Sequence, residues 1–278
     1  METQETIGLI AGNGTFPLLF TRAARELGYR VVAVAHRGET LENIVNEADQ
    51  VTWVRVGQLG RSIRAFRSAG VKRAVMAGGI DKVRSLLAVR PDWTGLRALR
   101  KSRGRGDDAL LRSVAEEFEN AGINIVSSTS FLPHIVSSGG RIAGPRPQKS
   151  DLDDVRLGCD VLRALGPHDV GQSVVVERGI VLAIEAVEGT DAALRRAGTL
   201  GRGRSVLVKM AKHGQDMRFD APAVGPTTIE MMAATGARTL AVEAGAAIVL
   251  EGDRVCVLAD RYGIAVLGCN AAGEVTDV

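Results

Sequence analysis

A segment rich in acids and bases in the second half of the chain carries the side chains best suited to chemistry. Asp216 and Asp220 offer hard carboxylate oxygens of the kind that Mg²⁺ binds. Lys209, Lys212 and Arg218 offer cations that can neutralise phosphate charge. The segment lacks helical and strand periodicity, and long irregular segments between packed elements are often functional. The pattern predicts phosphoryl chemistry, in which a divalent cation polarises a P–O bond and activates water. Helix caps or surface ion pairs are the alternative for each carboxylate.

Other polar residues stand where helices are expected to begin. Glu188 and Thr190 lie at the start of a predicted helix at 191–200, and Thr227 opens another. Free N–H groups at a helix N-terminus attract anions, so all three are candidate substrate contacts. Capping of the helix is the simpler interpretation for Thr190. Lys209 lies inside an otherwise apolar strand, so its ammonium must emerge at a sheet edge or pair with another group.

Two glycine-containing loops follow predicted strands in the first half. One comes after the strand at 6–11 and opens a helix, and the other comes after the strand at 71–76. Ligands of open parallel sheets bind outside the carboxyl ends of the strands, and glycine lets a phosphate approach the backbone. A plain tight turn and a solvated lysine are the alternatives. The candidate phosphate or nucleotide contacts are Gly12, Asn13, Gly14, Gly78, Gly79 and Lys82.

Several other cofactor and site classes are disfavoured. A nicotinamide site is opposed by Pro17 at the third glycine position of the fingerprint and by a second strand that ends at Ala35, His36 and Arg37 without an acid. The four histidines lack metal-binding spacing, and no nucleophile-elbow motif occurs. Three distant cysteines without CxxC spacing oppose a zinc site or a disulfide framework and suit a reducing cytoplasm.

Length and composition bound the class of protein. The chain has 278 residues, of which 45% are hydrophobic and 24% charged, as expected of a globular protein with about two domains. We expect neither a secretory signal nor a membrane-spanning run. Aromatic residues make up 4%, which is poor material for stacking bases, so no nucleic-acid partner is expected. The five cations within 97–105 form either a solvated face or a surface for phosphates or anionic lipid.

The apolar pattern predicts two domains with different architectures. Short apolar runs alternate with helices up to residue 126, which predicts an α/β domain at 1–145, Rossmann-like with a parallel sheet. A loop or linker rich in glycine and proline is expected at 137–149. An α+β domain with a mixed sheet is expected at 146–278. Its predicted strands are 173–177, 180–188, 205–211, 239–250 and 254–259, with a tight turn at 252–253.

Four sequence segments together resemble a known family. They are IGLIAGNGTFP, MAGGIDKV, VEGTDAALRRAG and VLVKMAKHGQDMRFDAPAVGPTTI, and they occur in the family's order over essentially the whole chain. They resemble the bacterial UDP-2,3-diacylglucosamine pyrophosphatases of lipid A biosynthesis. The resemblance is to the magnesium-dependent type, which is unrelated to the calcineurin-like phosphoesterases that catalyse the same step.

The resemblance implies a reaction and a set of residues. The reaction is hydrolysis of UDP-2,3-diacylglucosamine to 2,3-diacylglucosamine 1-phosphate and UMP, by water attack on the α-phosphorus with Mg²⁺. Asp220 and Asp216 match the family's acids, which implies catalytic and metal-binding roles, and Lys209 matches the lysine of VLVK. His213 and Ala221 depart from the expected pattern without removing a charged group.

The resemblance also implies that the second domain, at 146–278, is catalytic and that a substrate cleft lies between the two domains. We expect a cytoplasmic enzyme of an acylated UDP-sugar, peripheral on the inner membrane, whose basic run at 97–105 docks on anionic lipid. A non-catalytic nucleotide-sugar-binding regulator that uses the same cleft is the alternative function. The sequence leaves open the number of metal ions, the acyl length, the domain that binds uracil and the oligomeric state, with a homodimer as one option.

Overall fold

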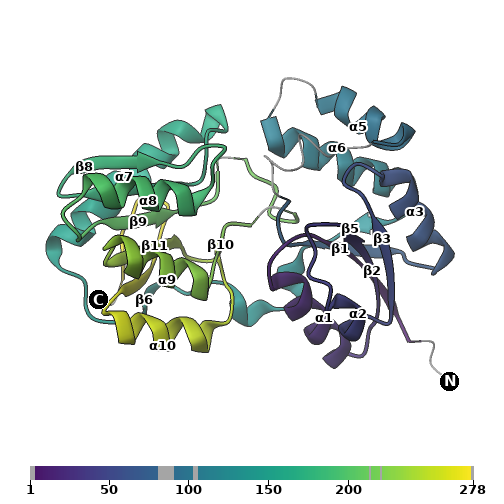
Figure 1. The fold of residues 1–278 in the computed structure, drawn as a ribbon, viewed down its shortest axis with the longest axis horizontal. Helices are drawn as coiled ribbons and strands as arrows, with labels where there is room; N and C mark the ends of the chain where they lie inside the picture. The colour runs from purple at the N-terminus through teal and green to yellow at the C-terminus, as the bar shows by residue number, and fades with distance from the viewer. Residues whose placement is uncertain (1–3, 81–90, 103–105, 213, 220, 277–278) are drawn as a thin grey trace. The chain divides into compact units, whose positions relative to one another are not determined.

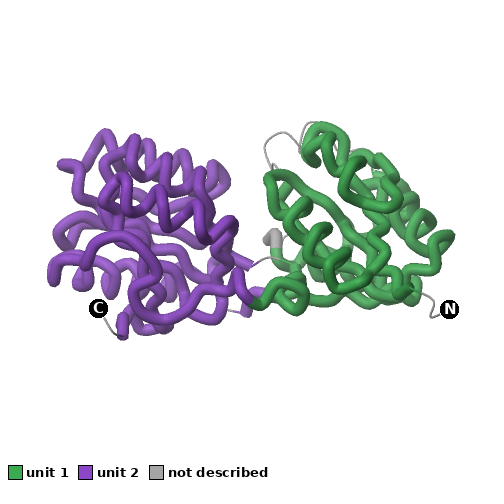
Figure 2. The backbone as a smooth tube through the Cα atoms, turned by 90° about the horizontal axis from the view of Figure 1, so that it is seen from below, with its two compact units in different colours: residues 1–133, 216–220 green, residues 134–215, 221–278 purple. Residues whose placement is uncertain are grey.

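The computed structural model describes residues 4–80, 91–102, 106–212, 214–219 and 221–276. Two compact units divide the chain (Figure 2). Unit 1 comprises Met1–Pro133 together with Asp216–Asp220, and unit 2 comprises His134–Gln215 together with Ala221–Val278. A short segment from the second half of the sequence therefore belongs to unit 1. None of the described helices is long and apolar enough to cross a membrane.

Unit 1 is a parallel five-stranded sheet with helices packed on it, in the strand order β3-β2-β1-β4-β5 (Figure 1). The strands are β1 (Thr6–Ala11), β2 (Arg30–His36), β3 (Gln50–Val54), β4 (Arg73–Ala77) and β5 (Asn124–Ile125). The helices are α1 (Phe16–Glu26), α2 (Ile44–Glu47), α3 (Leu59–Ser68), α5 (Trp93–Ser102) and α6 (Gly106–Asn120).

Burial explains why the strands of unit 1 appear in the sequence as short apolar runs. In β2, the residues from Val31 onward are buried, as expected of a parallel strand covered on both faces. Phe66 of α3 and Phe118 of α6 pack in one cluster with Val32 and Val34. The predicted parallel α/β sheet is therefore confirmed.

Unit 2 is a mixed six-stranded sheet in the order β6-β13-β11-β9-β7-β8, in which β13, β11 and β9 are parallel. The strands are β6 (Gly140–Ala143), β7 (Ser173–Glu177), β8 (Ile180–Ile184), β9 (Val206–Lys209), β11 (Thr239–Glu243) and β13 (Ala265–Cys269). A separate parallel pair joins β10 (Ala223–Val224) to β12 (Ile248–Val249). The helices are α7 (Lys149–Leu165), α8 (Thr190–Leu200), α9 (Pro226–Thr235) and α10 (Gly252–Tyr262).

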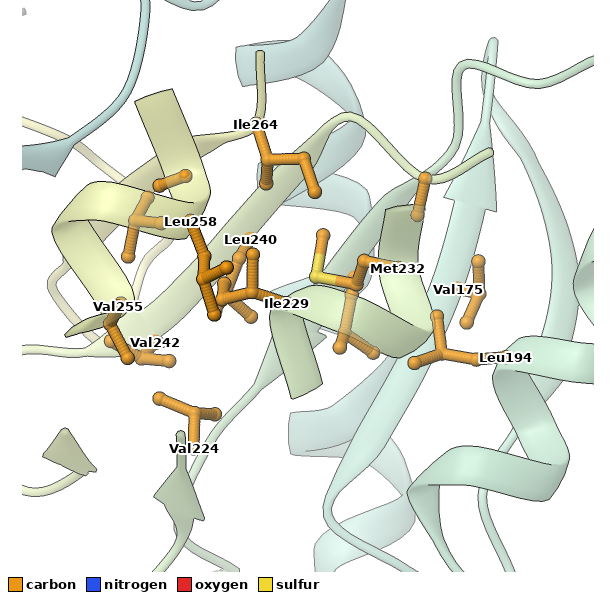
Figure 3. Packing of buried hydrophobic residues seen from close by; sticks show 14 of the residues in the cluster. Val175, Leu194, Val224, Ile229, Met232, Leu240, Val242, Val255, Leu258 and Ile264 are labelled. Carbon is orange, nitrogen blue, oxygen red and sulfur yellow. The ribbon is translucent and has the colours of Figure 1, made fainter. Parts of the chain in front are cut away.

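Two apolar clusters hold the helices against this sheet. In the larger cluster, Ile229 and Met232 of α9 pack near Leu240 of β11, together with residues of α8 and α10 (Figure 3). In the second, Val155 of α7 packs with alternate residues of the same strands, such as Val208. The predicted mixed sheet of the second half is confirmed.

Several sequence predictions for unit 2 are wrong. Residues 254–259 form part of helix α10 and not a strand, and residues 252–253 begin that helix and do not form a hairpin turn. Val255 is buried while Val257 is 66% exposed, a contrast that a strand would not give because both would face the same side. The strand predicted at 239–250 ends at Glu243 and resumes only as β12, and the loop expected at 137–149 contains β6. Strand β13 was not predicted.

Candidate functional site

The carboxyl ends of the parallel strands of unit 1 meet at one edge of the sheet. The chain leaves β1 toward β2 and β3 on one side, and β4 and β5 lie on the other. The β1–β4 boundary is therefore a topological switch point, where ligands of open α/β sheets bind. Both predicted glycine loops lie there, since they directly follow these two strands.

Backbone hydrogen bonds join the two glycine loops. The N–H of Gly12 donates to the carbonyl of Ala77 at 2.8 Å, and the N–H of Asn13 donates to the carbonyl of Gly79 at 2.7 Å. The Oδ1 of Asn13 accepts from the N–H of Gly79 at 3.1 Å. The structure thus brings the two predicted loops together into one backbone assembly.

Close backbone approach requires glycine at two of these positions. A Cβ on Gly12 would lie 2.2 Å from the carbonyl oxygen of Gly79. Gly78 has a φ of +82°, and a Cβ there would lie 2.3 Å from the carbonyl oxygen of Asn13. These glycines therefore serve loop packing first, whether or not a phosphate also approaches them.

Gly12→Ala is expected to lower the free energy of unfolding by roughly 2–3 kcal/mol, because the new methyl group overpacks rigid backbone. Gly252→Ala is the matched control, since a Cβ there meets nothing within 4 Å. Urea unfolding of the two variants against wild type measures the difference. Equal stability of the two variants would contradict the close approach.

Side chains from the end of β2 support the same edge, and the sequence did not point to them. His36 donates from Nδ1 to the carbonyl of Ala11 at 2.8 Å, and the hydroxyl of Thr40 donates to the same oxygen at 2.6 Å. Burial lowers the pKa of the His36 imidazole. The Nδ2 of Asn13 donates to Glu39 at 3.4 Å. An acid, Glu39, therefore does reach this edge. It lies three residues after the end of β2, whereas the dinucleotide fingerprint would place the acid at the strand end itself.

The described part of the segment, residues 216–219, is anchored on unit 1 by its own side chains. Arg218 donates from Nη2 to Asp216 at 2.8 Å and from Nη1 to Glu119 of α6 at 2.9 Å. Phe219 packs against the core cluster that includes Phe118. The hydrogen bonds from Arg218 lower the pKa of Asp216 despite its partial burial. Asp216 is therefore an ionised carboxylate at neutral pH, held at the carboxyl end of β5, whose last residue, Ile125, also accepts from Arg218.

The donor chemistry at Asp216 fits Mg²⁺, which proteins commonly hold through one or two carboxylates together with substrate phosphates. A carboxylate has about four lone-pair sites, and Arg218 directs four hydrogen bonds at Asp216, two to each oxygen, so a bound ion would share these oxygens with Arg218. Asp220, the second predicted ligand, and Lys82 lie outside the described residues, as does His213. Within the described ranges, no group of three or more His, Cys, Asp or Glu side chains is arranged to hold a metal.

Lys209 ends β9, an inner strand of the sheet of unit 2, so the first of the two alternatives for this lysine, an edge position, does not apply. The pairing alternative is correct, because Nζ donates to the Thr190 hydroxyl at 3.1 Å. The predicted capping role of Thr190 is also wrong: the N-cap of α8 is Gly189, and no side chain caps the helix. The two predicted site residues thus meet at the end of the sheet.

The remaining predicted contacts of unit 2 have varied surroundings. Lys212 donates to Asp169 at 2.5 Å. Glu188 accepts from Arg196 at 2.8 Å, and this hydrogen bond lowers the pKa of the Glu188 carboxyl. Thr227 is exposed in the first turn of α9. These residues belong to the same unit as Lys209, whereas the glycine loops, Asp216 and Arg218 belong to unit 1.

Comparison with known proteins decides the family. The LpxI N-terminal domain family matches residues 6–135, and the LpxI C-terminal domain family matches residues 138–267. The chain belongs to the LpxI family. A member from Caulobacter vibrioides, named UDP-2,3-diacylglucosamine pyrophosphatase LpxI, is 34% identical over 275 residues, covering 95% of this chain and 97% of its own. The resemblance carried by the four sequence segments is confirmed.

Solved structures give weaker likenesses. The structure of gox2253 covers 89% of this chain and 78% of its own, with 11% identity and a TM-score of 0.30. The biotin carboxylase subunit of pyruvate carboxylase covers 67% of this chain with 14% identity and a TM-score of 0.27. The LpxI-family chain described here spans 39% of that subunit.

Proposed function

We propose that this chain hydrolyses UDP-2,3-diacylglucosamine to 2,3-diacylglucosamine 1-phosphate and UMP, by water attack on the α-phosphorus, as a step of lipid A biosynthesis. The observation that carries the proposal is 34% identity over 95% of the chain to a protein named for this pyrophosphatase activity. The buried lysine of unit 2 and the ionised acid on unit 1 supply charges of the kinds that this reaction needs.

The roles of the residues follow from their chemistry. Bound Mg²⁺, held by Asp216 and Asp220, would supply Lewis-acid polarisation of the diphosphate. Lys209 and Lys212 place positive charge toward the diphosphate, and Arg218 fixes Asp216 while adding a further cation. The proposed substrate contacts are of two groups. On the nucleotide side they are Gly12, Asn13, Gly14, Gly78, Gly79 and Lys82, and in unit 2 they are Glu188, Thr190 and Thr227.

Release of UMP from UDP-2,3-diacylglucosamine, with Mg²⁺ and with a chelator, tests this function. Wild type should release UMP with Mg²⁺ and lose that activity with the chelator. UDP-glucosamine without acyl chains should react far more slowly, because each buried methylene contributes about 0.8 kcal/mol to binding. A non-catalytic regulator would instead bind the acylated nucleotide sugar and release no UMP under either condition.

We further propose that the enzyme is cytoplasmic and docks on the inner membrane through helix α5. Trp93 is 85% exposed, the largest exposed fraction among the large hydrophobic side chains of the described residues. Together with Thr94, Leu96, Arg97 and Arg100 it lines a shallow hollow of about 310 Å³. Tryptophan and arginine on one helix face are typical of helices that lie in the interface of an anionic bilayer.

The charge available on α5 is smaller than the sequence indicated. Arg97 pairs with the buried carboxylate of Glu117, and Lys101 pairs with Glu116. Arg100 has no ion pair within the part of the chain that the structure describes, and Arg103 and Arg105 lie outside it. Docking on lipid is therefore expected to depend on Trp93 and Arg100 more than on the number of cations.

The double variant Trp93→Ala, Arg100→Gln should bind vesicles that contain phosphatidylglycerol roughly tenfold more weakly than wild type at low salt. Co-sedimentation measures this, with the exposed Arg146→Gln as the control for charge alone. Because the chain has two tryptophans, Trp53→Phe leaves Trp93 as the one tryptophan, and brominated lipid should quench its emission. Unchanged binding of the double variant, or absence of quenching, would reject docking by α5.

A further inference from the structure

A buried polar network lies at the end of the sheet of unit 2, on the face covered by α8. Ser173 pairs in register with Lys209, and the N–H of Glu185 donates to the carbonyl of Ser173 at 2.9 Å. Glu185 directly follows β8, so the three residues form one row across β9, β7 and the end of β8, with their side chains on the same face. Their exposed fractions are 8% for Glu185, 0% for Ser173 and 8% for Lys209.

The hydrogen bonds of this network have defined donors and acceptors. The hydroxyl of Ser173 donates to Oε2 of Glu185 at 2.6 Å, and the hydroxyl of Thr190 donates to Oε1 at 3.1 Å. With its proton directed at Glu185, the Thr190 oxygen accepts from Lys209 at 3.1 Å. The Glu185 carboxylate is therefore linked to the Lys209 ammonium through one hydroxyl group, that of Thr190. Among the described residues, no carboxylate forms an ion pair with Lys209 within 4.0 Å.

The remaining charged groups near Lys209 are engaged elsewhere or lie farther along the same elements. Glu243, at the end of the neighbouring strand β11, accepts from the N–H of Ala211 at 3.0 Å. Asp191 follows Thr190 in the first turn of α8. Helix α7 packs against the opposite face of the sheet, with Val208 and not with Lys209. Of the carboxylates in the described residues, Glu185 is thus the one linked to Lys209 by hydrogen bonds.

We infer that Glu185 is a positioning residue for Lys209, an inference that rests on the proposed function. A buried ammonium without a partner is costly, and a direct ion pair would cancel the charge that the diphosphate needs. The hydroxyl of Thr190 separates the two charges, so the carboxylate orients Lys209 through this hydroxyl. An ammonium has three donors, and Thr190 takes one, which leaves the others for phosphate oxygens.

Kinetics of Glu185→Gln, Thr190→Val and the double variant test the link. Glu185→Gln should lower kcat roughly tenfold at neutral pH and shift the alkaline limb of the kcat/KM profile about one pH unit downward, since an opposite charge nearby raises a lysine pKa. The double variant should be no slower than Thr190→Val alone, because Glu185 acts through Thr190. Thr190→Ser, which keeps the hydroxyl, should have the same alkaline limb of the kcat/KM profile as wild type.

Glu177→Gln is the matched control. Glu177 is another buried carboxylate of the same sheet, 5% exposed, and its oxygens accept from the N–H of Arg202 at 2.9 and 3.0 Å, with no bond to Lys209. This variant should lower stability and leave the pH profile unchanged. If the alkaline limb of the kcat/KM profile shifts equally in Glu185→Gln and Glu177→Gln, the role of Glu185 is merely structural.

A measurement without turnover separates this inference from the proposed function. NMR of lysine labelled at the ammonium, assigned by comparison with Lys209→Arg, should give a lower pKa for Lys209 in Glu185→Gln than in wild type or Glu177→Gln. An identical Lys209 pKa in all three, or multiplicative effects of Glu185→Gln and Thr190→Val on kcat, would overturn the positioning role. If Glu185→Gln does not fold, the alkaline limbs of the kcat/KM profiles of Thr190→Val and Thr190→Ser are compared instead, and equal limbs would overturn the positioning role. Absence of UMP release by wild type would overturn the proposed function and leave the NMR result to stand.

Discussion

Asp220→Ala is expected to lower UMP release by roughly 10³-fold or more, with little change in the midpoint of urea unfolding. The reason is the loss of one of two carboxylates proposed to bind Mg²⁺ close to the α-phosphorus. Two neighbours on the segment have anchors of their own. Phe219 packs in the core cluster of unit 1, and Asp216 is held by Arg218. The fold should therefore tolerate the change while the reaction does not.

Asp253→Ala is the control for this experiment, because Asp253 is an exposed acid in the first turn of α10. UMP release is measured over a range of Mg²⁺ concentrations. If Asp220 binds the ion, the residual activity of Asp220→Ala should need more Mg²⁺ than wild type. Near-normal turnover of Asp220→Ala at low Mg²⁺ would remove Asp220 from the catalytic machinery.

The sequence predicted unit 1 better than unit 2 for a physical reason. Parallel strands buried on both faces appear as uninterrupted apolar runs, as at residues 31–36, and the glycines that follow mark the strand ends. In unit 2, helix α10 carries Val255, Cys256 and Val257 in succession, a run with high β propensity. Packing of Val255 on α9 and β11 overrides that propensity.

The candidate site shows a similar division. Residue type and spacing singled out Lys209, Thr190 and the glycine loops. They did not single out Glu185, because its link to Lys209 depends on the pairing across β7, where Ser173 is in register with Lys209 and its carbonyl accepts from the N–H of Glu185. Glu39 was missed because the dinucleotide fingerprint places the acid at the strand end. Here the acid lies in the turn after β2, and its carboxylate accepts a hydrogen bond from Asn13.

Lys209→Met is expected to lower kcat/KM by roughly 10²- to 10³-fold, the loss typical of a single preorganised group that stabilises transition-state charge. Methionine has a similar volume, so the surrounding cluster, with Leu207 on the same strand face, should remain packed. Glu185 would keep both hydroxyl donors, Ser173 and Thr190, so removal of the cation should leave no unsatisfied carboxylate.

Stability and activity should therefore separate in this variant. Because a buried ammonium costs desolvation, Lys209→Met should unfold at the same or a higher urea concentration than wild type, while UMP release falls. Lys149→Met, at an exposed position at the start of α7, is the control for loss of one positive charge and should keep full activity. A parallel fall of stability and turnover in Lys209→Met would instead mean that the Lys209–Thr190 bond holds α8 on the sheet, and the diphosphate would then need a different cation.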